Sequence, residues 1–194
     1  MTTSQVSTQL PQDDQDLTGL LGKHLIYTYS NGWKYELYIK NAHTVEYRVH
    51  PSKGVPNPLT GRWVKDLRAV TARLGDGLYS VAWVQVAGTC ASLVINTQQR
   101  WLHFSGFLAK WAGDNPTPLA GFQNEHLDEI LRYRDIGPIA PQVQEDLFAT
   151  ITFVEDRGVD NEEVIACPPE QVPDGFSTAP TDPIHPLGRK VLSW

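Results

Sequence analysis

Tyr27 and Tyr29 are the residues whose type and spacing are best suited to chemistry. Because side chains alternate along a β-strand, two residues separated by one position point to the same side. A pair of phenols on one face can line a pocket and offer two O–H donors to a ligand. The same pair can instead belong to an aromatic core, with each hydroxyl bonded to water or to the backbone. The residues around them leave both interpretations open.

Both tyrosines lie in a predicted β-hairpin. Asn31 and Gly32 form an Asn-Gly pair between two runs in which aromatic and polar residues alternate. This is the strongest short-range signal for a tight turn between antiparallel strands. After the turn, Trp33 and Tyr35 share one face of the second strand, and the opposite face is mostly polar. The hairpin therefore has one strongly aromatic side.

Short alternating segments predict further antiparallel strands after the hairpin, separated by turn residues such as the Pro- and Gly-rich segment 51–60. The expected strands are 43–50, 61–74, 78–86, 89–96, 100–107 and 147–154. Residues 125–134 have apolar side chains at nearly helical spacing and predict one helix that plugs or flanks the sheet, whereas 110–113 predict only a turn. Consecutive strands of this kind close most simply into an up-and-down barrel, because closure removes exposed edges. Small barrels hold one small ligand.

The chain is expected to form a single domain between two irregular ends. Its 194 residues are enough to bury a substantial core, and the barrel domain is placed at 17–167. Residues 1–16 are polar, cannot bury enough apolar surface to offset the entropy of ordering, and predict a disordered tail. Residues 168–194 form a Pro-rich extension, which predicts an extended arm lying on the domain or on a partner subunit.

Composition excludes several classes of function. The net charge of −6, with no Lys/Arg run longer than two, argues against nucleic acid and membrane surfaces as partners. No apolar run is long enough to span a bilayer, and the N-terminus lacks the apolar core of a signal peptide, so a cytoplasmic location is expected. Cys90 and Cys167 are expected to be free thiols. Neither these cysteines nor the histidines have the spacing of metal ligands, so no metal site is expected.

Five segments, in this order, resemble the signature blocks of the phenolic acid decarboxylases. They are IYTYSNGW (26–33), YRVH (47–50), GRWV (61–64), FQNEH (122–126) and GVDNEEVI (158–165). The resemblance implies a lipocalin-like β-barrel that is intracellular, uses no cofactor and is typically a homodimer. It also implies an activity: conversion of 4-hydroxycinnamic acids, such as p-coumaric and ferulic acid, to 4-vinylphenols and carbon dioxide.

The same resemblance implies roles for particular residues. Tyr27, Tyr29 and Arg62 match family residues that orient the anionic end of the substrate, and the planar fork of an arginine can bond both oxygens of a carboxylate. Four further residues match positions near the family's pocket: Asn31, Trp33, Tyr35 and Glu125. Four of the five other tryptophans are expected to be aromatic core: Trp63, Trp83, Trp101 and Trp111.

One departure from the family dominates the functional question. Where the family has Ser-Trp-Thr-Glu-Pro-Thr-Gly-Thr, with the Glu as its general acid and base, this chain has AWVQVAGT at 82–89. Gln85 therefore replaces the carboxylate, and an amide cannot donate and retrieve a proton at ordinary pH. Val84, Val86 and Ala87 differ as well, and the loop before Arg62 is longer than usual, which favours a divergent natural relative over a single engineered change.

Two classes of function remain open. In the first, the chain is a carbon–carbon lyase of this family, or a related lyase or isomerase, in which water held by Gln85, or Glu125, supplies the proton. In the second, the barrel binds an aromatic acid without converting it. Both predict that Tyr27, Tyr29, Arg62 and Gln85 face one interior space and that the ligand is a small phenolic molecule.

Overall fold

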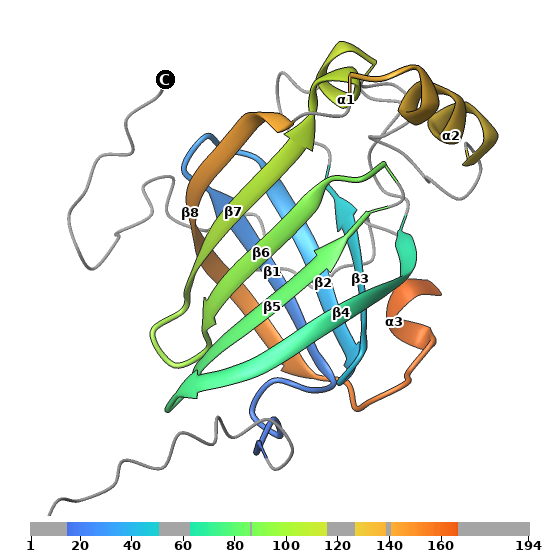
Figure 1. Cartoon of the computed structure of the whole chain (residues 1–194). Coiled ribbons are helices and arrows are strands. Elements are labelled where there is room, and N and C mark those ends of the chain that lie inside the picture. Colours follow the sequence, from blue (N-terminus) through green and yellow to red (C-terminus); the bar gives the residue numbers. More distant parts are fainter. Residues whose placement is uncertain (1–14, 51–62, 86, 116–126, 139–140, 167–194) are drawn as a thin grey trace, which may run out of the picture.

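Eight antiparallel strands form a closed barrel in which each strand pairs with its neighbours in sequence and the last pairs with the first. The computed structural model describes residues 15–50, 63–85, 87–115, 127–138 and 141–166. Figure 1 shows the strands wrapped around a common axis. They are β1 (Lys23–Tyr29), β2 (Lys34–Asn41), β3 (Thr44–Val49), β4 (Val64–Gly75), β5 (Leu78–Val84), β6 (Cys90–Asn96), β7 (Trp101–Ala109) and β8 (Pro141–Asp156). The predicted mainly-β, up-and-down barrel is confirmed.

The strand that closes the barrel is longer than the sequence predicts. β8 covers 16 residues instead of the expected 147–154. Its first part pairs with β7 and its second part with β1, so it must reach two neighbours that end at different heights. A register shift between Ile26 and Tyr27 places a β-bulge beside the first candidate tyrosine.

Within the described ranges, three short helices accompany the barrel: α1 (Lys110–Asp114), α2 (Leu127–Ile136) and α3 (Glu163–Ala166). α2 is the predicted helix, whereas the turn predicted at 110–113 is the five-residue α1, and α3 was not predicted. Trp111 stacks on Tyr133 with 6.2 Å between ring centroids, and Ile130 is completely buried. α1 and α2 therefore pack together at one end of the barrel and flank it (Figure 1). Among the described residues, no helix has both the length and the apolarity needed to cross a membrane.

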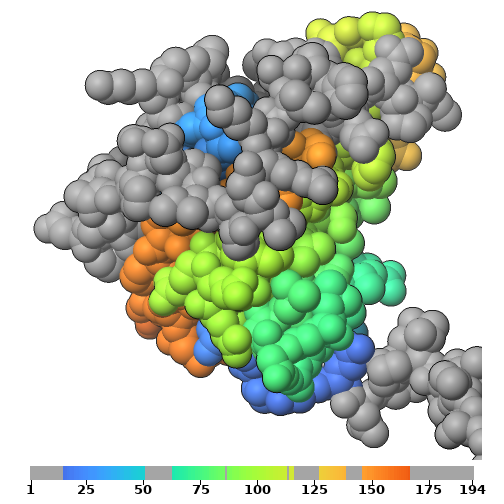
Figure 2. Space-filling model, turned by 90° about the vertical axis from the view of Figure 1, so that its left-hand side faces the viewer, coloured from blue at the N-terminus to red at the C-terminus, as the bar shows by residue number. Residues whose placement is uncertain are grey.

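The interior of the barrel is filled by the inward-pointing residues of its strands, of which Leu25, Leu37 and Leu93 are completely buried. The turn before β1, blue in Figures 1 and 2, covers the end opposite α1 and α2, and Leu20 in this turn is also completely buried. Gly19 is needed there because a Cβ at this position would lie 2.1 Å from the hydroxyl oxygen of Tyr79.

The predicted tail and C-terminal extension fall mostly outside the described residues. Of the predicted tail, the structure describes only Gln15 and Asp16. Gln15 Oε1 accepts a hydrogen bond from the backbone N–H of Arg73 at 2.7 Å, and Asp16 Oδ1 accepts one from the hydroxyl of Thr18 at 2.6 Å. Gln15 and Asp16 thus take part in the described hydrogen bonds, and residues 168–194 lie outside the described residues.

Candidate functional site

Four tyrosines line the barrel interior toward the end at which α1 and α2 lie. Tyr27 and Tyr29 are buried and meet edge to face, with 5.3 Å between their ring centroids. Tyr35 stacks on Tyr27 at 6.0 Å and on Tyr47 at 6.2 Å, with interplanar angles of 16° and 25°. The alternation of the hairpin places Tyr27, Tyr29 and Tyr35 on one side, as the sequence predicts. The four rings form one continuous aromatic wall.

The turn of the hairpin extends this wall toward solvent. Trp33 is 41 % exposed and stacks on Tyr35 with 6.3 Å between the ring centroids. Asn31 is exposed in the turn, and its Oδ1 accepts a hydrogen bond from the backbone N–H of Trp33 at 3.1 Å. Trp33 is therefore part of the aromatic wall, whereas the contact that Asn31 makes stabilises the turn.

Gln85 and Trp83 continue the wall on the far side of Tyr47. The amide Nε2 of Gln85 donates a hydrogen bond to the hydroxyl oxygen of Tyr47 at 2.9 Å. Trp83 is buried, and its ring centroid lies 6.1 Å from that of Tyr47. Gln85, which the family resemblance matches with an acidic residue, thus lies in the same cluster as the paired tyrosines.

Burial further disfavours ionisation of two phenols in this cluster, Tyr27 and Tyr47. It raises the pKa of Tyr27 well above its usual value, and a hydrogen bond with Tyr29 offsets part of that effect. Burial likewise raises the pKa of Tyr47, and the nearby Tyr27 adds to the shift. At neutral pH these hydroxyls are neutral, so they can donate hydrogen bonds but cannot act as bases.

The structure brings most of the predicted site residues together. Tyr27, Tyr29, Tyr35, Trp33 and Gln85 belong to the interior cluster or its rim. Arg62 and Glu125 lie outside the described residues, so their places in the site remain predictions. Sequence reasoning treated Tyr47 only as a strand residue and Trp83 as core. The available signal was their position on the same strand faces as Val45 and Gln85.

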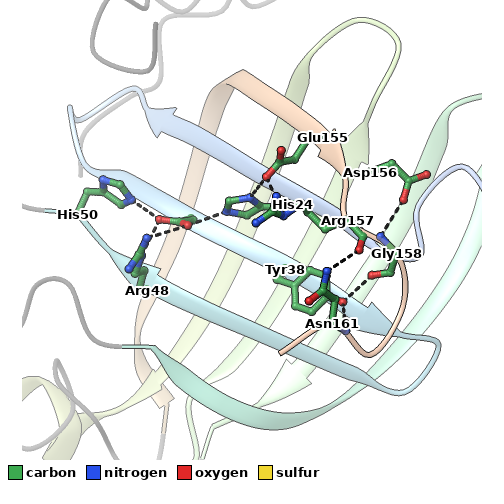
Figure 3. Close-up of polar contacts among 10 residues, drawn as sticks. His24, Tyr38, Arg48, His50, Glu155, Asp156, Arg157, Gly158 and Asn161 are labelled. Carbon is green, nitrogen blue, oxygen red and sulfur yellow. Dashed lines mark hydrogen bonds and ion pairs between the residues drawn. The ribbon is translucent and has the colours of Figure 1, made fainter. Parts of the chain in front are cut away.

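A second polar cluster lies on the outer face of β1, β2 and β3 (Figure 3), centred on Glu36, whose side chain is completely buried. Its Oε1 contacts His24 Nε2 at 2.6 Å and Arg48 Nη2 at 3.0 Å. Its Oε2 contacts Arg48 Nε at 2.6 Å and His50 Nε2 at 2.5 Å. The guanidinium of Arg48 also lies 4.9 Å from the ring centroid of Trp63, which packs over it. We call Glu36, His24, Arg48 and His50 the outer network.

The outer network stabilises an ionised carboxylate in a buried place. Burial by itself raises the pKa of Glu36, but the hydrogen bonds from His24, His50 and Arg48, together with the charge of Arg48, outweigh it and hold the pKa well below its usual range. The sequence places Glu36 on the polar face of β2 and gives no sign that it is buried. The partners come from β1 and β3, so only the barrel pairing could reveal them.

The segment around α3 docks beside the outer network. Tyr38 is completely buried, and its hydroxyl donates to the backbone oxygen of Gly158 at 2.6 Å and accepts from the backbone N–H of Asn161 at 2.8 Å (Figure 3). Lys40 contacts Glu46 at 3.2 Å and also contacts Glu162. The segment 158–165, one of the five signature blocks, therefore packs against the outside of β2 and is attached there by hydrogen bonds and ion pairs.

Neither cluster resembles a metal centre. In the part of the chain that the structure describes, no group of three or more His, Cys, Asp or Glu side chains could hold a metal ion. His24 and His50 are engaged by Glu36, and His103 by Asp146. The interior cluster instead presents neutral donors and flat apolar rings, which suit an aromatic ligand bearing oxygen atoms.

Comparisons with known proteins agree with this description. The model of the family described as "Phenolic acid decarboxylase (PAD)" matches residues 17–179. A probable phenolic acid decarboxylase of Vibrio cholerae is 42% identical over 161 residues, which cover 83% of this chain and 90% of the relative. The phenolic acid decarboxylase PadC of Bacillus subtilis is 39% identical over 153 residues, covering 79% of this chain and 92% of the relative. The chain belongs to the phenolic acid decarboxylase family.

Proposed function

We propose that the chain is a cofactor-free enzyme of this family that acts on a 4-hydroxycinnamic acid or a related phenolic acid, with decarboxylation weakened by the loss of the acidic side chain. The observation that carries the proposal is the interior cluster, in which the paired tyrosines and Gln85 are joined through Tyr35 and Tyr47. The family supplies the substrate class, and the cluster supplies the groups that would hold it.

The reaction needs little from the protein. Direct loss of carbon dioxide from a cinnamate would leave a vinyl carbanion, so the para-hydroxyl must give up its proton and push electrons through the ring while an acid protonates the carbon that bears the carboxylate. The resulting quinone methide accepts the electrons of the breaking carbon–carbon bond, and carbon dioxide leaves as the ring regains aromaticity. The proton that the hydroxyl loses returns to the phenolate formed when carbon dioxide leaves. The protein must supply oxygen-binding donors, a proton donor and a dry slot for the flat ring.

The described residues fit two of these three requirements. The neutral hydroxyls of Tyr27 and Tyr29 would donate hydrogen bonds to an anionic oxygen of the substrate, and Arg62, by its family resemblance, would pair with the same end. The stacked rings of Tyr35 and Tyr47 would form one wall of the slot for the substrate ring. Exclusion of water from this interior would strengthen each of these interactions.

The third requirement, the proton donor, is the weak point. The amide of Gln85 has no proton to transfer, and loss of a positioned general acid lowers a rate by about 10² to 10⁴. A water molecule held by Gln85, or Glu125, is the proposed substitute. We therefore expect decarboxylation to be slow compared with relatives that keep the glutamate.

A second candidate function follows from the bond between Gln85 and Tyr47. The Gln85 amide and the Tyr47 hydroxyl are both neutral and can hold a ligand without transferring a proton to it. The chain would then be a barrel that binds an aromatic acid, or a lyase or isomerase that takes its proton from another group. Incubation of the purified protein with p-coumaric and ferulic acid, followed by ultraviolet absorbance and calorimetry, separates these cases. Vinylphenol formation supports the enzyme, binding without turnover supports the second candidate, and absence of both refutes the proposal.

We also propose that the protein is a cytoplasmic homodimer whose partners do not include nucleic acid or membranes. Support for the dimer comes from an apolar patch on the outside of β4, β5 and β7. There the side chain of Val70 is 72% exposed and that of Val84 is 60% exposed. Cys90 on β6 pairs with Val84 on one side and with Phe107 on the other, so these residues lie in one row across the strands. A second copy would cover this patch. Light scattering after gel filtration should show a dimer that Val84→Lys weakens.

A further inference from the structure

The indole N–H of Trp83 is a buried donor without a partner. Trp83 lies on β5 with 7% of its surface exposed, and no hydrogen-bond acceptor in the described structure contacts its Nε1 atom. Buried donors are almost always paired, because burial removes the water that would otherwise satisfy them. An orphaned N–H inside a candidate binding site therefore calls for an acceptor that arrives with the ligand.

The surroundings of Trp83 are suited to such a ligand. The residue belongs to the same interior core cluster as Tyr27, Tyr29 and Tyr47. Its cross-strand neighbours are Ala69 on β4 and Ala91 on β6. These small side chains add little bulk beside the indole, so a flat molecule lying against the aromatic wall would need to displace few atoms to reach the ring edge.

We propose that Trp83 is a substrate-binding residue, whose Nε1–H donates a hydrogen bond to an oxygen atom of the bound phenolic acid. The inference rests on the proposed function and adds a binding group to it. An indole can donate but cannot accept, so it selects an acceptor oxygen, which both the carboxylate and the phenol of the substrate carry. Because Gln85 lies two residues further along the chain from Trp83, this bond would fix the substrate close to the position where the proton must be delivered.

Trp63 provides a matched control within the same chain. Its Nε1 is also buried, no acceptor among the described residues bonds to it, and its surface is 5% exposed. It lies outside the barrel, however, where it contacts Arg48 and His24. Trp63 and Trp83 thus share a buried N–H without an acceptor among the described residues, but only Trp83 faces the interior cluster.

The test replaces each indole by 3-benzothienylalanine, in which sulfur takes the place of the N–H and the ring shape is kept. Calorimetry with p-coumaric acid should show about tenfold weaker binding after replacement of Trp83 and unchanged binding after replacement of Trp63. Cinnamic acid, which keeps the carboxylate, and 4-vinylphenol, which keeps the phenol, identify the bonded oxygen, since only a ligand that carries it should lose affinity. If the Trp83 variant binds each of the three ligands as tightly as the wild-type protein does, the inference is overturned.

A spectroscopic measurement on the unaltered protein is independent of whether the variant folds. With ¹⁵N-labelled tryptophan, binding of p-coumaric acid should move the indole proton of Trp83 downfield and slow its exchange with solvent, while the signal of Trp63 stays in place. Binding detected by calorimetry without slower exchange at Trp83 would refute the inference and leave the proposed function standing. If calorimetry detects no binding of any of the three ligands, the proposed function fails first and the inference fails with it.

Discussion

Replacing Gln85 by glutamate would restore a titratable group at the position of the family's acid with almost no change in side-chain volume. Packing should therefore tolerate the change. The contact with Tyr47, now 2.9 Å long, would persist with its direction reversed, because the phenol would donate to the new carboxylate. Burial should raise the pKa of the new carboxyl and the bond from Tyr47 should lower it, so part of the population remains protonated at mildly acid pH.

The expected gain follows from what a positioned acid contributes. General acid catalysis is worth about 10² to 10⁴ in rate, or roughly 3 to 5 kcal/mol of activation free energy at about 1.4 kcal/mol for each factor of ten. Ala87, which is completely buried, still differs from the family and can misplace the substrate. We therefore expect Gln85→Glu to raise the rate of decarboxylation of p-coumaric acid at least about tenfold.

The assay is vinylphenol formation by the two proteins under identical conditions, measured across pH. Activity of the variant should fall as the pH rises through the pKa of the new carboxyl, because only the protonated form donates. Gln98→Glu is a matched control that adds the same charge to an exposed turn residue and should leave the rate unchanged. A wild-type protein that is already fast, or a variant that binds the acid without any gain in rate, would refute the reasoning. In the first case another residue must donate the proton, and Glu125 is the next residue to replace.

Three further predictions test the rest of the structure. Replacing Tyr27 and Tyr29 together by Phe should leave the circular dichroism spectrum unchanged and weaken binding of p-coumaric acid by about 1 to 3 kcal/mol in calorimetry; equal affinity would make the pair core residues only. Glu36→Gln should lower the free energy of unfolding in urea by about 3 to 5 kcal/mol, because it leaves the buried charge of its arginine partner uncompensated. The pKa of Glu36 is lowered in the folded state, so its contribution to stability is present above its unfolded pKa of about 4.3 and is lost as the pH falls toward the lowered value. Parallel losses of stability in the wild-type protein and the variant between pH 5 and pH 3 would contradict this. Gly19→Ala should cost about 1 to 3 kcal/mol of stability through its collision with Tyr79, and a Tyr79→Phe background that leaves this cost undiminished would contradict the steric explanation.

The fold was largely predictable from the sequence because local signals and barrel geometry agree. The Asn-Gly turn and the alternation around Tyr27 and Tyr35 specify a hairpin and its inner face without reference to the rest of the chain. The closing strand was less predictable, since its first residues are paired only because β7 extends alongside them. Its length is set by the barrel and leaves little trace in its own composition.

The sequence predicts the site only through the alternation of side chains along each strand and through the resemblance to the family. This alternation shows that Tyr47 and Gln85 lie on interior faces, but the bond between them joins residues 38 positions apart and depends on the curvature of the barrel. Glu36 shows the opposite limit. Its place on a polar strand face predicts exposure, whereas partners on two neighbouring strands and the ring of Trp63 enclose it.

The outer network has a consequence for how this protein could be altered. His50 and Trp63 are the residues on either side of the segment 51–62. His50 contacts Glu36 and Trp63 contacts Arg48, so both are attached to the outer network. The two attachment points are thus held by the barrel, whatever the length of chain between them. Doubling the length of such a connection costs only about 0.6 kcal/mol in closure entropy. We therefore expect that segments of different length can be exchanged between these two anchors while the barrel stays the same.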